Sequence, residues 1–122
     1  RSGERWEFQW AKEHTFLNPF DFTGLEETLE RLKGRPVYFT VDLDVMDPSV
    51  FPGTGTPEPG GVTFDQLREA AQMVCSQANV VGCDVNELSP HYDLSGASTA
   101  AACKIVREMA LALQRQDQEK HR

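Results

Sequence analysis

The sequence has few cysteines and no long apolar run, and each shortage excludes a class of protein. The three cysteines form no Cys-x-x-Cys pair, which argues against a disulfide framework and against a zinc ribbon. Each lies in an expected helix or strand beside apolar residues, so Cys75, Cys83 and Cys103 are predicted to be small buried side chains. No stretch approaches the roughly 18 apolar residues of a membrane span, and no signal peptide is recognisable. We therefore expect no membrane partner and a reducing, cytoplasmic setting.

The sequence also lacks an excess of positive charge. Its 122 residues include 12 lysines and arginines against 19 aspartates and glutamates, for a formal net charge of −7, and no face carries a basic stripe. Nucleic acids bind basic surfaces, so no nucleic-acid partner is expected. The acidic balance suits a cationic small molecule or a metal ion better, although solubility alone is the commoner reason for such a charge.

The hydrophobic pattern predicts helices that alternate with two short strands, all within one domain. The expected elements are a helix at 25–33, a strand at 37–41, a helix at 63–77, a strand at 79–85 and a helix from about residue 98. Residues 1–22 are aromatic-rich without a clear period, and residues 114–122 are polar and expected to fray. This order predicts an α/β fold with parallel strands that belong to a larger sheet.

The most informative stretch runs from Val37 to Gly61 and reads VYFTVDLDVMDPSVFPGTGTPEPGG. Its apolar start is typical of a strand buried on both faces, and Asp42 and Asp44 follow at the carboxyl end of that strand. Because side chains of extended chain alternate between faces, both carboxylates are expected to point the same way. Adjacent negative charges repel unless one is protonated or a cation lies between them. The prolines and glycines that follow predict a long loop over this sheet edge, where α/β proteins bind ligands.

Three interpretations of this Asp-Leu-Asp segment stay open on the residues alone. In the first, the carboxylates cap the turn that follows the strand, as aspartate often does. In the second, residues 41–45 match the short DxDx[TV] pattern of haloacid-dehalogenase-type phosphatases, whose first aspartate is a phosphorylated nucleophile beside Mg²⁺. In the third, the pair belongs to a two-metal hydrolase, in which ions about 3.5 to 4 Å apart activate a water molecule.

The wider context favours the third interpretation. The run DLDVMDPSVFPGTGTPEPGG, followed by DVNELSP, resembles the ureohydrolase (arginase/agmatinase) family, and its agmatinase branch most closely. The resemblance covers nearly the whole chain. It implies a three-layer α/β/α fold with a parallel sheet, and residues 1–122 are expected to be the carboxyl-terminal part of a single ureohydrolase domain.

By this resemblance, the candidate site residues have distinct roles. Asp42 would bridge two Mn²⁺ ions and Asp44 would bind one of them, so both are candidate catalytic and metal-binding residues. Glu87 lies where the family has the glutamate that pairs with the substrate's guanidinium, and Thr56 lies in the GTGTP turn that lines the same pocket. A carboxylate suits such a planar cation independently of the family, through two parallel hydrogen bonds. Asp47 is expected to brace the loop rather than to bind metal.

The resemblance also implies a substrate and a reaction. The segments PEPGG and Ser89-Pro90 are similar to agmatinase, so agmatine is the expected small cationic guanidino substrate, hydrolysed to urea and putrescine. Guanidinobutyrase and arginase activities are the alternatives. Family members are commonly homo-oligomers, so the full-length protein is expected to self-associate.

The chain departs from the family in its histidines. The family's other metal ligands lie in upstream GGDH and DAHxD motifs, and neither motif occurs in these residues. His14, His91 and His121 match none of those ligands, although His91 is near enough to Glu87 in sequence to touch a substrate. We therefore expect the chain by itself to bind Mn²⁺ weakly and to hydrolyse nothing. A truncated ureohydrolase that serves as a non-catalytic binding module is the alternative.

Overall fold

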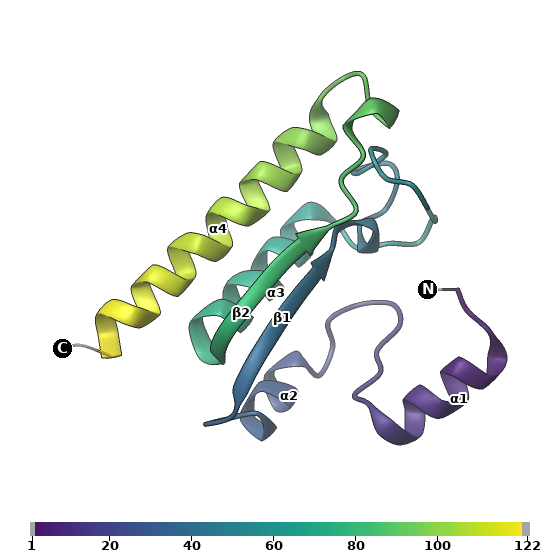
Figure 1. The fold of residues 1–122 in the computed structure, drawn as a ribbon. Coiled ribbons are helices and arrows are strands. Elements are labelled where there is room, and N and C mark those ends of the chain that lie inside the picture. The colour runs from purple at the N-terminus through teal and green to yellow at the C-terminus, as the bar shows by residue number, and fades with distance from the viewer. Residues whose placement is uncertain (1, 121–122) are drawn as a thin grey trace.

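The computed structural model describes residues 2–120 (Figure 1). In chain order its elements are α1 (Arg5–His14), α2 (Leu25–Arg31), β1 (Pro36–Asp42), a 3₁₀ turn (Leu43–Val45), α3 (Phe64–Gln77), β2 (Asn79–Asn86), a second 3₁₀ turn (Pro90–Tyr92) and α4 (Ala97–Lys120). No helix within residues 2–120 combines the length and the apolar character that a membrane crossing requires.

β1 and β2 form a parallel two-stranded sheet, which confirms the prediction from the order of elements. Pro36 pairs with Asn79 at one end of the sheet, and Asp42 pairs with Asn86 at the other. Both strands therefore end at the same edge, and the chain segments that leave them lie close together in Figure 1. This edge is where the sequence predicted the functional site.

Helices cover one face of the sheet. Val41 of β1, with 4 % of its surface exposed, packs in a core with α3 and α4, and Leu29 of α2 packs with Val74 of α3 in a smaller cluster. On the opposite face Tyr38 is 65 % exposed. Residues 2–120 thus form the sheet and one helical layer of the expected three-layer arrangement. The largest fully buried side chains are Phe51, Leu43, Met46, Ile105, Cys75 and Ser98.

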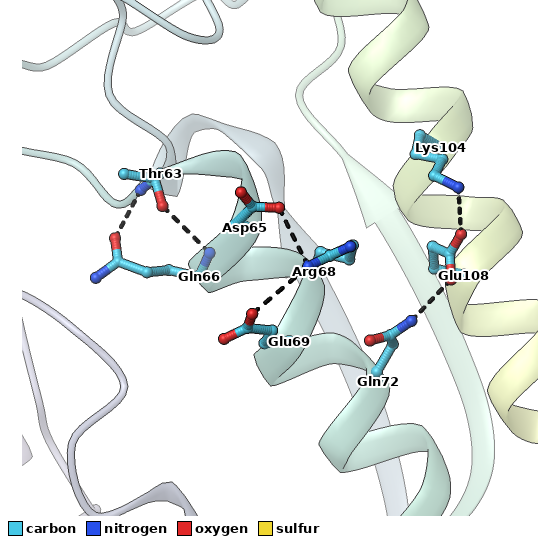
Figure 2. A network of polar contacts seen from close by, with 8 residues as sticks. All are labelled: Thr63, Asp65, Gln66, Arg68, Glu69, Gln72, Lys104 and Glu108. Carbon is cyan, nitrogen blue, oxygen red and sulfur yellow. Dashed lines mark hydrogen bonds and ion pairs between the residues drawn. The ribbon is translucent and has the colours of Figure 1, made fainter.

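A polar link joins α3 to α4 beside this core (Figure 2). Gln72 Nε2 donates to Glu108 Oε2 at 2.7 Å, and Lys104 Nζ lies 2.5 Å from the other carboxylate oxygen of Glu108. The Lys104 ammonium is the main reason why the pKa of Glu108 is lowered. The charge of Glu108 is therefore stabilised at the helix pair, although most of its side chain is covered.

α3 begins with the predicted capping box (Figure 2). The Thr63 hydroxyl oxygen accepts from the Gln66 N–H at 3.2 Å, and the Thr63 N–H donates to Gln66 Oε1 at 2.8 Å. Two backbone donors that the helix cannot satisfy internally are paired in this way.

We expect Thr63→Ala to lower the free energy of unfolding by about 1 kcal/mol, because alanine cannot accept the hydrogen bond from the Gln66 N–H. Thr63→Ser keeps the accepting oxygen and is the matched control, with an expected loss below about 0.5 kcal/mol. Urea denaturation followed by circular dichroism measures both values. Equal losses in the two variants would contradict the role of the hydroxyl.

The amino-terminal region differs from expectation. A helix spans Arg5–His14, where the sequence showed no clear period. None of its residues is buried, and Trp6 and Trp10 are 65 % and 55 % exposed. A local hydrogen bond from the Glu4 N–H to Glu7 Oε2, at 2.7 Å, closes its first turn. Trp6 and Trp10 are four residues apart, a spacing that places both on one helix face, although neither is buried among the described residues.

The prediction for the cysteines is wrong in part. Cys75 is buried as predicted, but Cys83 and Cys103 are exposed. Cys83 lies on β2, which is an edge strand, and Cys103 follows the buried Ala102 on a helix, where consecutive side chains point about 100° apart. α4 extends to Lys120 and so includes the polar residues 114–120, whose fraying stays a prediction. Residues 121–122 of the predicted tail lie outside the described residues.

Candidate active site

The predicted pair of carboxylates lies where β1 ends. Asp42 is the last residue of β1, and Asp44 lies in the 3₁₀ turn that follows. Asp42 Oδ1 accepts from the Asp44 N–H at 3.1 Å, so Asp42 also caps this turn, as the first interpretation proposed. The expected extended alternation is wrong here, because the chain already turns at Leu43. Leu43 is nonetheless buried while both carboxylates lie nearer the surface, so the turn produces the predicted arrangement by another route.

Thr56 and Glu87 meet these carboxylates from two other segments. Thr56 Oγ1 donates to Asp44 Oδ2 at 2.8 Å. Glu87 follows β2 and lies over Gly55, where an added Cβ would be 3.9 Å from Glu87 Oε2. The pKa of Asp42 is raised, mainly by desolvation and further by the negative charges of Asp44 and Glu87. The structure therefore brings all four predicted site residues together at one edge of the sheet.

The backbone of Glu87 is in the left-handed region, with φ of 70°. A residue with a side chain rarely adopts this conformation, which costs about 1 to 3 kcal/mol and persists where the surrounding structure imposes it. Such strain is concentrated at functional sites. The sequence contained no signal for it, because glycine and asparagine are the usual residues at such a position.

Asp47 ties together the two ends of the loop 48–61. Its Oδ1 accepts from the Ser49 N–H at 3.0 Å and from the Ser49 hydroxyl at 2.5 Å. Its Oδ2 accepts from the N–H groups of Gly60 and Gly61, at 2.8 and 3.3 Å. The predicted bracing role of Asp47 is confirmed, and these bonds, those from Ser49 first, lower its pKa to about 2.

Acidification is expected to remove the contribution of Asp47 to stability. Folding lowers the pKa of this carboxyl from its ordinary 3.8 to about 2, so the ionised group stabilises the fold above about pH 4 and loses this effect as the pH falls through about 2. The free energy of unfolding should therefore fall more steeply below about pH 5 in the unmodified chain than in Asp47→Asn. Urea titrations at several pH values measure the two slopes. Parallel slopes would contradict the assignment.

Asp42 and Asp44 fit part of a divalent metal site. Carboxylate oxygens are ligands that Mn²⁺ and Mg²⁺ prefer, and a cation between them would offset the desolvation and the repulsion that raise the pKa of Asp42. Within the described part of the chain, however, no three His, Cys, Asp or Glu side chains lie close enough to hold an ion. Asp42 and Asp44 are therefore two candidate ligands of such a site.

The two described histidines do not supply these donors. His14 Nδ1 lies 2.8 Å from Trp10 O, and its ring stacks on the Trp10 ring at 4.5 Å. The His91 ring lies 4.1 Å from that of Tyr92, in the 3₁₀ turn that follows Glu87. Contact of His91 with a substrate stays a prediction, and His121 lies outside the described residues.

Two further aspartates have several hydrogen-bond partners that the sequence did not indicate. On the open face of the sheet, Asp84 accepts from Tyr38 Oη and Thr40 Oγ1, each at 2.7 Å, and from Asn86 Nδ2. These bonds, that from Thr40 first, lower the pKa of Asp84. Asp93, before α4, is a second such residue. Asp84 has the pattern of an ordinary strand aspartate because Tyr38 and Thr40 are distant in sequence. Asp93, whose partners Ser95 and Ser98 are close in sequence, has the pattern of an ordinary cap aspartate.

The segment that contains this site matches the sequence model of a known protein family. The model of the Arginase family matches residues 1–112, which include every candidate site residue. This chain belongs to the arginase family. The membership displaces the phosphatase interpretation of the Asp-Leu-Asp segment.

Individual proteins that are similar to this arginase-family chain support the same assignment. It is 49 % identical over 115 residues to the agmatinase of Bacillus anthracis, a match that covers 91 % of the chain and 39 % of that protein. It is 44 % identical over 87 residues to the human mitochondrial guanidino acid hydrolase, covering 71 % of the chain and 24 % of that protein. A Clostridium difficile structure, described as a candidate agmatinase, superposes with a TM-score of 0.87 at 47 % identity, covering 93 % of the chain and 42 % of that structure. The α/β fold with its parallel sheet is thereby confirmed, and the chain spans about two fifths of the length of the agmatinase that it matches.

Proposed function

We propose that this chain supplies part of the active site of a ureohydrolase of the agmatinase type. One observation carries the proposal: the Asp42 and Asp44 carboxylates and the Glu87 carboxylate, which follow different strands, lie with Thr56 at the same end of the sheet. The first pair has the chemistry to hold divalent cations, and Glu87 has the chemistry to hold a planar cation beside them.

Each residue then has a separate task. Asp42 and Asp44 would hold Mn²⁺, and the bound metal would supply a water molecule activated near neutral pH. Thr56, whose hydroxyl donates to Asp44 Oδ2, orients that carboxylate. Glu87 accepts the N–H groups of the guanidinium and so places its central carbon near the carboxylate pair. The products would be urea and an amine.

The similar proteins support a proposal for the substrate. An agmatinase is among the most similar proteins, so we propose agmatine as substrate and putrescine as the amine product. A guanidino acid is the alternative, because a guanidino acid hydrolase is also similar. We further propose a cytoplasmic location, in keeping with three unpaired cysteines, and self-association of the complete protein. The other metal ligands would come from outside residues 2–120, so the chain by itself should release no urea.

A segment exchange tests this proposal. The chain replaces the matching 115-residue part of the Bacillus anthracis agmatinase, which supplies the remainder of the fold. We expect Mn²⁺-dependent release of urea from agmatine, with a strong loss in Glu87→Gln, which keeps the size of the side chain but not its charge. A folded, metal-loaded exchange protein that releases no urea from any guanidino compound would overturn the proposal. Preference for a guanidino acid would move the substrate assignment to the alternative.

A further inference from the structure

A buried polar cluster lies where the chain enters α4, outside the residues that the proposed function uses. Asp93 is 8 % exposed and Ser98 is fully buried. Asp93 Oδ2 accepts from the Ser98 N–H at 2.8 Å and from the Ser98 hydroxyl at 2.6 Å. Asp93 Oδ1 accepts from the N–H and the hydroxyl of Ser95, at 3.1 and 2.6 Å. The Ser95 and Ser98 donors hold the pKa of Asp93 well below its usual range, so the carboxylate is ionised at neutral pH.

This cluster is connected to the loop that carries Thr56. The single hydroxyl proton of Ser98 is donated to Asp93, so the Ser98 oxygen is oriented to accept, and it accepts from the Gly53 N–H at 2.8 Å. A Cβ on Gly53 would lie 2.7 Å from Ser98 Cβ, so the loop backbone lies directly against α4. Only glycine permits this approach.

The same glycine is connected to the segment that carries Glu87. The Gly53 carbonyl accepts from the Ser89 N–H at 2.8 Å. Ser89 follows Glu87 by two residues, and Gly53 precedes Thr56 by three. The segment that carries Glu87 is therefore hydrogen bonded to the Thr56 loop at Gly53, and Ser98 fixes that glycine to the helix.

We propose that Asp93 and Ser98 are positioning residues of the substrate site, which set the placement of Glu87 relative to Thr56. Ser98 accepts from the Gly53 N–H and Gly53 accepts from the Ser89 N–H, so the two residues act through Gly53 and Ser89. The inference rests on the proposed function for the roles of Glu87 and Thr56. The hydrogen-bonded connection itself can be tested without any activity.

Three variants separate positioning from general stability. Ser98→Ala leaves the buried Gly53 N–H without its acceptor, and Ser98→Thr keeps the hydroxyl. Ala102→Gly, at a buried position one turn further along α4, weakens the helix without removing a hydrogen bond of Gly53, and is the matched control. Amide hydrogen exchange of Gly53 and Ser89, measured by NMR on the 122-residue chain, is the direct readout.

We expect Ser98→Ala to increase the rate of hydrogen exchange at the Gly53 and Ser89 amides by at least about tenfold, relative to core amides of α4. Loss of one buried hydrogen bond is sufficient for a change of this size. The Thr56 and Glu87 resonances should shift with it. Ser98→Thr should restore both signatures, and Ala102→Gly should show neither. If Ser98→Ala does not fold, Gly53→Ala, which pushes the loop off α4 but keeps Asp93 and Ser98, should give the same signature.

A folded Ser98→Ala chain with unchanged Gly53 and Ser89 exchange and unchanged resonances would overturn the inference, as would equal changes in Ala102→Gly. In the exchange protein, Ser98→Ala should lower kcat/KM for agmatine about 10- to 100-fold, mainly through KM, with recovery in Ser98→Thr. If the exchange protein releases no urea at all, the proposed function fails, whereas the amide exchange still decides whether Asp93 and Ser98 position the two segments.

Discussion

Replacing Asp42 with asparagine in the exchange protein is expected to lower urea release by more than about 100-fold, the upper end of what the outer partners of metal ligands cost. Asparagine has nearly the same shape and can still accept the hydrogen bond from the Asp44 N–H, so the 3₁₀ turn should persist. What is lost is the negative charge that would face the metal. The measurements are urea release and Mn²⁺ content after gel filtration.

Asp65→Asn is the matched control for this change. Asp65 is an exposed carboxylate in the first turn of α3, where it lies 3.2 Å from Arg68 (Figure 2), so the same chemical change there should leave activity and Mn²⁺ content intact. The 122-residue chain offers a simpler readout, since Mn²⁺ that binds to it weakens the paramagnetic resonance of the free ion. Full Mn²⁺ binding and activity in Asp42→Asn would remove Asp42 from the ligand set.

Phe51→Ala is expected to lower the free energy of unfolding by about 3 to 5 kcal/mol. Phe51 lies in the proline- and glycine-rich loop, yet it is completely buried in the main core with Leu43, Met46 and Val62. Alanine would leave a cavity that the loop and the sheet cannot both close. A small domain has only about 5 to 15 kcal/mol of stability, so this variant should unfold at much lower urea concentration.

Circular dichroism is the suitable probe for this measurement, because Trp6 and Trp10 lie on the exposed helix α1 and report poorly on the core. Phe20→Ala is the control. Phe20 is 71 % exposed, so its replacement should change the free energy of unfolding little. Phe51→Leu should lower the free energy of unfolding less than Phe51→Ala does, because leucine keeps most of the buried volume. A loss in Phe51→Ala no larger than that in Phe20→Ala would show that the loop is not anchored through this ring.

The elements that sequence patterns predicted correctly are those with a strong local signal. The capping box at Thr63 and Gln66, the apolar strand before Asp42 and the buried face of α3 all depend on residues a few positions apart. The elements that patterns misjudged depend on partners distant in sequence. Cys83 is exposed because β2 has no further neighbour among the described residues, which its own apolar sequence cannot reveal.

The same distinction between local and distant signals applies to the candidate site. Asp42, Asp44, Thr56 and Glu87 could be selected from the sequence because their chemistry and their place after strands are local properties, reinforced by a family resemblance. The connection among Asp93, Ser98 and Gly53 could not, because it joins residues up to 45 positions apart whose types are common in caps and turns. The left-handed backbone of Glu87 is likewise imposed by its surroundings.

The sequence by itself determined which side chains are available for metal and guanidinium binding, and that two parallel strands present them at one edge. Only the tertiary structure decided how those side chains meet: Thr56 on Asp44, Glu87 over Gly55, and Gly53 held between Ser98 and Ser89. The physical reason is that strand and helix signals arise from neighbouring residues, whereas hydrogen bonds between loops depend on the packing of the whole chain.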